Sequence, residues 1–392
     1  MKPRLVSIAL LAASLAGFVS CGSGESGEKN VDSIVAKAQK RISKGDYKKA
    51  LNLLCDSLTD DEMLASELNT QTLARAFYAL ANTSELLKDD FKFDVEDRGV
   101  EFELDKDKRH LVASFFDNRM VKVYDFPSMH ERLTVNAPSQ VYKAALSPDS
   151  TILAVATYDN NVYLYDYPSG KKHGELEGHK HSVRDVAFTP YGMLISCSND
   201  HRVKAWDVNF LTELWSVNPH SLNVKSVSMS SDGSMIASCS NDGSVQTFYF
   251  DGYGQPKYEG TYIDVANNYV NDVAMSPDGS VVAAASGDEK LSFFDVEYRN
   301  LLGAFTLDSS GLSVAYSPDG SLVAVGTAYS LYIIDTKNYV QLAALKNVGS
   351  NIWSVDFVDN STIIAGDNDG IKTIRLLGPN ELVSGARRLR KS

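Results

Sequence analysis

Histidine, serine and aspartate, the residue types of acid–base and nucleophilic chemistry, occur in this sequence in a repeated order. The first set is His179, Ser196 and Asp200, followed by Trp206. A neutral imidazole can donate a hydrogen bond from one ring nitrogen and accept one at the other, so it can link a carboxylate to a hydroxyl. The same order returns in a second set, which consists of His220, Ser238 and Asp242. Such side chains serve either a reaction or a buried network that stabilises the fold when every partner is present.

Sequence motifs of common enzymes do not accompany these residues. The chain has no nucleophile elbow, no HExxH zinc motif, no Walker loop and no CxxC pair. His181 and His201 could share one rim, but no carboxylate or cysteine stands beside the pair at metal-ligand spacing. We therefore interpret both sets as structural, and we predict no catalytic residue, no metal site and no cofactor.

Turns of the Ser-Pro-Asp-Gly type divide the chain from residue 91 onward into units of similar length. They begin at residues 147, 189, 230, 276 and 317, so successive turns are 41 to 46 residues apart. Short runs that alternate between polar and apolar residues lie between the turns, which is typical of strands. A period of this length with four short strands is the signature of β-propeller blades.

One unit, from Gly178-His179 to Trp206-Asp207, closely resembles the WD-repeat family. The resemblance implies a mainly β fold, a seven-bladed propeller over residues 91–385, and a hydrogen-bonded chain through the first set of residues above. A strand at 91–96 is expected to close the ring against the last blade, because closure removes exposed sheet edges. The expected blades are 99–140, 141–181, 182–222, 223–268, 269–310, 311–350 and 351–385.

Residues 30–90 carry helical patterns instead of strand patterns. Ile34, Ala38 and Ile42 share one face of a predicted helix, and the stretch ending in "KGDYKKAL" resembles one tetratricopeptide repeat. One or two such repeats need support from another part of the chain, so we expect this segment to lean on the propeller. The basic tail, residues 386–392, is expected to be a solvated end that frays.

The first residues have the features of an export signal. Lys2 and Arg4 precede an apolar run from Leu5 to Val19, which is too short to span a bilayer. The following "FVSC" resembles the lipobox of bacterial lipoproteins, which implies removal of residues 1–20, a lipid on Cys21 and a flexible tether at 21–29. We expect an exported bacterial lipoprotein, anchored in a membrane at the periplasmic face or the cell surface. An ordinary secreted signal peptide is the alternative.

Three further cysteines, Cys55, Cys197 and Cys239, are too few and too widely spaced for a disulfide framework. Cys197 and Cys239 occupy the same position in adjacent blades, which places them about 10 Å apart. A disulfide cannot bridge that distance, so we predict free thiols.

One residue near the start of each blade's first strand falls where WD-repeat proteins line the rim of their channel. By the period of the repeats, these residues are Val100, Tyr142, Arg184, Lys225, Asn271, Leu312 and Trp353. Tryptophan, tyrosine and arginine are enriched in binding hot spots. We therefore predict a non-enzymatic scaffold in the cell envelope, which binds a protein or peptide on this rim.

Two other functions stay open. A propeller enzyme of the lactonase or lyase kind would gather several histidines, aspartates and glutamates at the channel, and the sequence reveals no such ring. A receptor for a carbohydrate or small ligand would use the aromatic residues of the rim. Nucleic acid is not expected as a partner, because the net charge of −12 repels phosphate backbones. The oligomeric state and the identity of the partner are not predicted.

Overall fold

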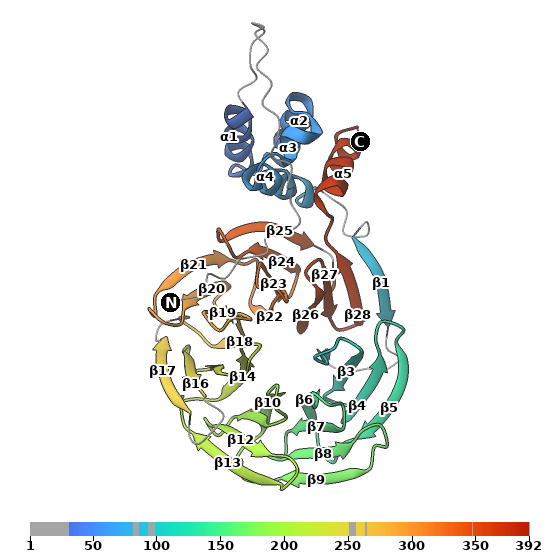
Figure 1. Cartoon of the computed structure of the whole chain (residues 1–392), viewed down its shortest axis with the longest axis vertical. Helices are drawn as coiled ribbons and strands as arrows, with labels where there is room; N and C mark the ends of the chain where they lie inside the picture. The colour runs from blue at the N-terminus through green and yellow to red at the C-terminus, as the bar shows by residue number, and fades with distance from the viewer. Residues whose placement is uncertain are drawn as a thin grey trace, which may run out of the picture.

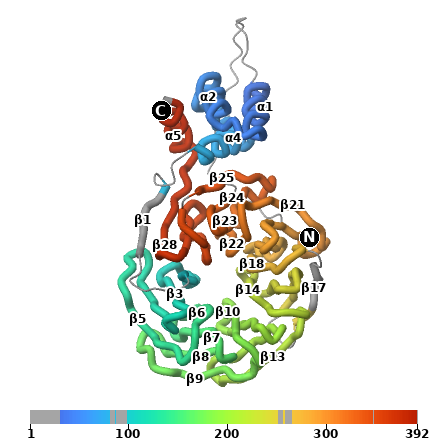
Figure 2. The backbone as a smooth tube through the Cα atoms, turned by 180° about the vertical axis from the view of Figure 1, so that it is seen from behind, coloured from blue at the N-terminus to red at the C-terminus, as the bar shows by residue number. Residues whose placement is uncertain are grey.

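The computed structural model describes residues 31–80, 86–92, 99–250, 256–262, 265–346 and 348–391. In this part of the chain, seven four-stranded antiparallel sheets are arranged in a ring, and a group of helices stands at one side of the ring (Figures 1 and 2). The protein is a mainly β, seven-bladed propeller preceded by a few short helices, as the repeats predicted.

Each of the first six blades contains four consecutive strands, and the first of the four is innermost. The innermost strands are β2 (Val100–Leu104), β6 (Val141–Leu146), β10 (Val183–Phe188), β14 (Val224–Met229), β18 (Val270–Met275) and β22 (Gly311–Tyr316). The second strands are β3 (His110–Phe115), β7 (Ile152–Thr157), β11 (Leu194–Ser198), β15 (Met235–Ser240), β19 (Val281–Ser286) and β23 (Leu322–Thr327). The third strands are β4 (Met120–Asp125), β8 (Val162–Asp166), β12 (Val203–Asp207), β16 (Val245–Tyr249), β20 (Lys290–Asp295) and β24 (Ser330–Asp335). The outermost strands are β5 (His130–Asn136), β9 (Lys172–Leu176), β13 (Thr212–Val217), β17 (Lys257–Tyr262), β21 (Leu301–Thr306) and β25 (Val340–Lys346).

The seventh blade joins the two ends of the ring. Its three inner strands are β26 (Ser354–Asp359), β27 (Thr362–Gly366) and β28 (Gly370–Arg375), and its outermost strand is β1 (Leu87–Lys92). Strand β1 runs antiparallel to β28. The prediction that an early strand closes the ring is correct, but this strand begins four residues before the predicted 91–96. Residues 93–96 lie outside the described part of the chain.

The repeated turns set the length of each blade through their side chains. In the turn between β18 and β19, the Ser276 hydroxyl donates to Asp278 at 2.7 Å and accepts from the Val281 amide at 2.9 Å. Gly279 supplies the left-handed conformation that the turn needs, with φ +74°. The turn therefore fixes where the second strand begins, and the apolar residues of that strand are buried between neighbouring blades.

The helices form one module from both ends of the described chain. They are α1 (Val31–Ile42), α2 (Tyr47–Ser57), α3 (Asp60–Leu64), α4 (Glu67–Tyr78) and α5 (Pro379–Lys391). Helices α1 and α2 are joined by a tight turn in which Gly45 has φ +74°, and α4 packs on β25. Buried residues of the helices share a single apolar core with blades 6 and 7, for example Phe77 with Leu345 and Phe357. The helical segment leans on the propeller, as expected.

The expectation of a frayed basic tail at residues 386–392 is wrong. Residues 386–391 belong to α5, in which Leu382, Val383 and Ala386 are buried against the other helices. The Arg387 guanidinium donates to the Leu58 carbonyl at 3.1 Å and to the Asp60 carboxylate at 2.6 Å. The apolar face of α5 and the contacts of Arg387 together hold the helix in place.

Three cysteines, Cys55, Cys197 and Cys239, are buried and have free thiols, as predicted. Cys21 lies outside the described residues, as do the predicted signal and tether. Within the described part, no helix is both long and apolar enough to cross a membrane.

Candidate interaction site at the channel mouth

The first His-Ser-Asp-Trp set forms one hydrogen-bonded chain inside blade 3. His179 Nδ1 lies 2.9 Å from the Asp200 carboxylate, and its Nε2 lies 2.8 Å from the Ser196 hydroxyl. The Trp206 indole N–H donates to the same hydroxyl at 2.8 Å. The side chains of His179 and Asp200 are only 1% and 3% exposed, so no substrate can reach them. Their position is that of a structural network.

The ionisation states of His179 and Asp200 agree with this hydrogen-bonded chain. Burial lowers the pKa of the His179 imidazole, so the ring is neutral at pH 7 and can both donate and accept. Burial alone would raise the pKa of Asp200, but hydrogen bonds from His179 and from the Lys180 amide outweigh it and lower the pKa to about 2. The carboxylate is therefore a permanent acceptor.

The second set forms a related but different network in blade 4. His220 Nε2 lies 2.9 Å from the Ser238 hydroxyl, as the pattern suggested. Its Nδ1 lies 3.0 Å from the Ser244 hydroxyl and 3.5 Å from Asp242, so the serine stands between ring and carboxylate. Phe248 is fully buried where blade 3 has its tryptophan.

The predicted rim residues come together at one end of the channel, where the innermost strands begin. Six of the seven line the channel cavity of about 730 Å³, which extends through the ring to Pro277 and Pro318 beyond the far ends of β18 and β22; these six are Tyr142, Arg184, Lys225, Asn271, Leu312 and Trp353. Val100 does not line this cavity. Its neighbour Gly99 does, and Val100 is instead buried inside the blade. We call this end the channel mouth and these six residues its first layer.

Aromatic rings hold one side of the channel mouth in place. The centroids of the Tyr142 and Phe116 rings lie 4.7 Å apart. The Arg184 guanidinium lies over the Tyr142 ring, with its central carbon 3.9 Å from the ring centroid. Trp353 donates its indole N–H to the Asn368 side chain at 2.7 Å. It lies so close to Gly99 that a Cβ there would fall 2.0 Å from the indole ring. The first layer is therefore preorganised for contact with a ligand.

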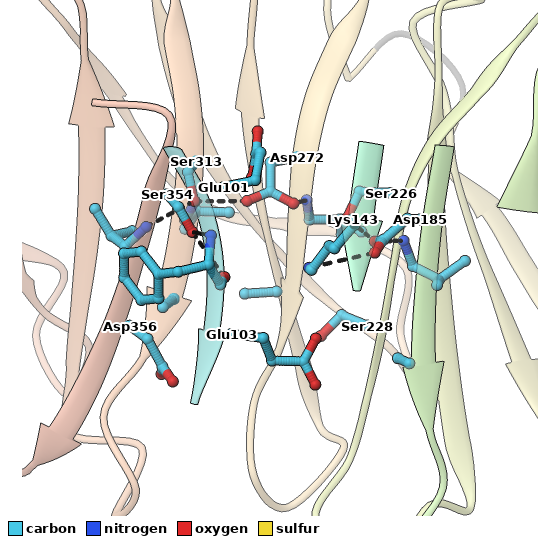
Figure 3. Close-up of a pocket in the computed structure, with 18 of the residues that line it drawn as sticks. Glu101, Glu103, Lys143, Asp185, Ser226, Ser228, Asp272, Ser313, Ser354 and Asp356 are labelled. Carbon is cyan, nitrogen blue, oxygen red and sulfur yellow. Dashed lines mark hydrogen bonds and ion pairs between the residues drawn. The ribbon is translucent and has the colours of Figure 1, made fainter. Parts of the chain in front are cut away.

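Sequence reasoning missed a second layer of channel residues directly below the first. In blades 2 to 6, the pairing of the innermost strand shifts register at the rim residue. Because of these bulges, two successive residues line the cavity instead of one. The second layer is Glu101, Lys143, Asp185, Ser226, Asp272, Ser313 and Ser354 (Figure 3). The sequence was expected to place no ring of several histidines, aspartates and glutamates at the channel. The structure corrects this in part, because Glu101, Asp185 and Asp272 line the cavity, whereas no histidine does.

Most of the second layer ties one blade to the next. The Asp185 carboxylate accepts from the Val227 amide of the next blade at 2.9 Å and pairs with Lys143 at 3.2 Å. Asp272 likewise accepts from the Val314 amide at 2.8 Å. These carboxylates have structural partners, which explains why acids lie so deep in the ring.

Two glutamates of β2 differ from these acids. Glu101 and Glu103 point into the channel from alternate positions of the same strand, and Figure 3 shows Glu103 one level deeper, near Ser228. Burial raises the pKa of Glu101 to about 7, and it raises the pKa of Glu103 to about 8. Lys143 opposes both shifts, and the neighbouring acids reinforce them. We therefore expect these two carboxyl groups to titrate near neutral pH.

Metal chemistry finds no support among the residues described here, since no group of three or more His, Cys, Asp or Glu side chains could hold an ion. His181, which was weighed as a possible ligand, is exposed, and its carbonyl accepts from Ser198. The channel mouth offers cations, aromatic faces and carboxylates, which are the parts of a recognition surface.

A family comparison agrees with this architecture. The model described as "WD domain, G-beta repeat" of the WD40 family matches residues 130–166, 170–207, 211–248 and 259–295. The chain is a WD40-repeat β-propeller protein. Each matched repeat of the propeller begins on the outermost strand of one blade and ends on the third strand of the next, so the first match runs from β5 through β8. Because each matched repeat includes strands of two blades, the connection from one blade to the next lies inside a repeat.

Curated relatives match over part of the propeller. The chain is 27% identical to "DDB1- and CUL4-associated factor 10" of Xenopus tropicalis, over 33% of this chain and 30% of the relative. It is also 27% identical to the Homo sapiens protein of that name, over 29% and 21%, and 24% identical to "Periodic tryptophan protein 2" of Arabidopsis thaliana, over 36% and 16%. The matches span less than a third of these relatives' lengths. The similarity is consistent with protein–protein interaction.

Proposed function

We propose that this WD40 propeller is a non-enzymatic scaffold that binds a protein or peptide at the channel mouth. The observation that carries the proposal is the convergence of six first-layer residues, from six different blades, on one cavity. Trp353, Tyr142 and Arg184 are of the types that dominate binding energy at interfaces. They are half-buried and held by fixed neighbours, so little side-chain freedom remains to be lost on binding.

The surface around the channel mouth extends this contact area. Tyr158 and Tyr329 follow the second strands of blades 2 and 6, and they are 55% and 65% exposed. Both tyrosines lie in turns at the end of the ring where the innermost strands begin. A partner that covers the mouth would therefore bury several aromatic side chains, as tight interfaces do.

The cellular setting is proposed from the sequence. A lipid on Cys21 would hold the propeller at a membrane of the cell envelope through the tether at 21–29. The partner would then be an envelope protein. The printed name of one relative associates it with DDB1 and CUL4. We do not extend that association to this chain, because the similarity covers a third of it.

A crosslinking experiment tests the binding proposal. A photoreactive amino acid replaces Tyr329, beside the channel mouth, and crosslinked partners are identified in intact cells by mass spectrometry. Trp353→Ala is expected to weaken binding by roughly 2 kcal/mol or more, as for a hot spot, and Arg184→Ala should also lower the yield.

A matched aromatic control separates the two ends of the ring. Tyr191 is 83% exposed in the turn between β10 and β11, at the opposite end of the innermost strands. Tyr191→Ala should keep the full crosslinking yield. Melting temperatures are measured for every variant. The proposal fails if Trp353→Ala and Arg184→Ala remain folded and keep the wild-type yield, since the interaction surface then lies elsewhere, for example on the helices.

A further inference from the structure

We infer that the channel mouth recognises a carboxylate of an acidic peptide segment, paired with Arg184 and Lys225, beside an apolar side chain. The inference rests on the proposed function and names the chemistry of the partner. Arg184 and Lys225 are first-layer residues of neighbouring blades 3 and 4. They bring two positive charges to the mouth of a protein whose net charge is −12.

No ion pair among the residues that the structure describes involves Arg184 or Lys225, although Glu101 is near enough to act on both cations through its charge. Arg184 Nε is buried without a hydrogen-bond partner. Lys143, one layer deeper, does have its partner, because it pairs with Asp185 at 3.2 Å. Burial lowers the pKa of Lys225, and the nearby Arg184 lowers it further. Two half-buried cations that lack a directly paired anion favour the binding of one.

The geometry of Arg184 suits a carboxylate. Its guanidinium stacks on the Tyr142 ring at 3.9 Å, and this contact fixes the plane of the guanidinium. The N–H groups of a guanidinium lie in its plane, so contact of its face with a tyrosine ring does not block them. Two of these N–H groups can then donate to the two oxygens of one carboxylate. Tyr142 lies beside Arg184, and Leu312 and Trp353 line the same cavity from blades 6 and 7, so an apolar side chain of the peptide can contact apolar surface at the mouth.

The acids of the second layer limit the charge of the ligand. Glu101, Asp185 and Asp272 line the same cavity as the two cations. A doubly charged phosphate would be repelled by these carboxylates more strongly than a singly charged carboxylate. The long phosphate backbone of a nucleic acid would in addition meet the acidic surface of the chain. We therefore assign an acidic peptide, rather than a phosphorylated one, to the mouth.

Glu101 couples this binding to protons. Arg184 and Lys143 favour its charged form, whereas burial, Asp272 and Asp185 oppose it. A bound carboxylate adjacent to Arg184 and Lys225 adds a like charge and screens these cations. Glu101 then takes up a proton on binding near pH 7. Binding is expected to be tighter below the pKa of Glu101 than above it.

The test uses the full chain and a fluorescent peptide that alternates glutamate with leucine, compared with the same peptide carrying glutamine. Fluorescence anisotropy gives the affinity at about pH 6 and about pH 8, on either side of the Glu101 pKa. Arg184→Gln and Lys225→Met should each weaken binding by about tenfold or more, the effect of losing a charge-assisted hydrogen bond. Glu101→Gln should tighten binding at about pH 8 and remove most of the difference between the two pH values. Lys40→Gln, an exposed cation of α1, is the charge-matched control and should change nothing.

Several outcomes would overturn the inference. It is wrong if the glutamine peptide binds equally well, if Lys40→Gln weakens binding as much as Arg184→Gln, or if a phosphoserine peptide binds much more tightly than the glutamate peptide. Arg184→Lys, which keeps the charge, provides a second variant if Arg184→Gln fails to fold. A crosslinking yield that depends on Trp353 without any binding of the acidic peptide would overturn this inference and leave the proposed function standing.

Discussion

Individual residues show how differently the same side-chain type can be used in this ring. Asp200 accepts hydrogen bonds from a buried imidazole, and Asp185 joins neighbouring blades while it pairs with a lysine. Among the residues that the structure describes, Glu103 makes neither kind of contact, and it lies half-buried in the channel with a raised pKa. Burial and partners, rather than residue type, therefore decide whether an acid stabilises the propeller or is kept at a cost in stability.

The network of blade 3 makes a stability prediction. Asp200→Ala leaves the His179 N–H without a partner in a buried site, which should lower the free energy of unfolding by about 1–3 kcal/mol. Asp288→Ala is the matched control from blade 5, where the carboxylate accepts from Ser286 and Lys290 but contacts no histidine. The smaller loss is expected there. Chemical denaturation measures both, and equal losses would contradict the special role of blade 3.

A second prediction concerns the pH dependence of stability. The pKa of Glu103 rises from 4.5 to about 8 on folding, so the folded state binds its proton more tightly than the unfolded state. Its stabilising contribution is complete below pH 4.5 and is lost as the pH rises toward 8. Glu103→Gln should therefore be more stable than the wild type at about pH 9, on the order of 2 kcal/mol because channel water screens the charge.

The control for this prediction is the pH at which the wild-type carboxyl is already protonated. At about pH 4 the two proteins should unfold at nearly the same denaturant concentration, since glutamine mimics the neutral carboxyl group. A constant difference across the whole pH range would show that the substitution changes packing and not ionisation.

Sequence periodicity could place the first layer at residue resolution but not the second. Six of the seven predicted rim residues line the cavity because equivalent positions in repeated blades face the same way. Strict alternation then assigns Asp185 and Asp272 to the interior of their blades. The bulge at the preceding residue turns both side chains into the channel, and a bulge leaves no reliable signature in a single sequence.

Single elements owe their positions to partners that are distant in sequence. Helix α5 begins four residues after the last propeller strand and packs against α2 and α4 of the opposite chain end. Leu382, Val383 and Ala386 form its buried face. The helical spacing of these apolar residues is present in the sequence. The basic residues of 386–392 instead led to the prediction of a solvated, frayed end. The closing strand β1 was misplaced by four residues because strand boundaries depend on pairing with β28.

The docking of α5 yields a prediction with a neighbouring control. Arg387 donates to the Leu58 carbonyl and the Asp60 carboxylate of the N-terminal helices, so Arg387→Ala should cost about 1–3 kcal/mol of stability. Arg388 is exposed on the same helix, and Arg388→Ala should stay within about 0.5 kcal/mol of the wild type. Thermal unfolding compares the two. Similar values would show that the contacts of Arg387 contribute little to the docking of α5.

The attachment of the whole molecule to a membrane is predicted from Cys21. A lipid there should carry the protein into the detergent phase on phase separation, since acyl chains contribute about 0.8 kcal/mol per buried CH₂ group. Cys21→Ser should release the protein into the aqueous phase. Cys55→Ser, which removes a buried thiol of the helical module, should leave the partitioning unchanged. Equal partitioning of the Cys21→Ser variant and the wild type would exclude the lipid anchor.

Closure of the ring also sets an order of events during synthesis. Leu87 of β1 pairs with Ile374 of β28, so the partners are separated by about 290 residues of chain. At roughly 5–20 residues per second, a ribosome needs on the order of 15–60 s to add that length. During this interval the first strand has no partner, the helices that precede it lack α5, and six blades can form while the seventh waits. Whether the chain folds beside the ribosome or after the export that its predicted signal implies, it exposes an unpaired strand and an uncovered apolar helix face until its last blade is available. It most needs protection from aggregation until then.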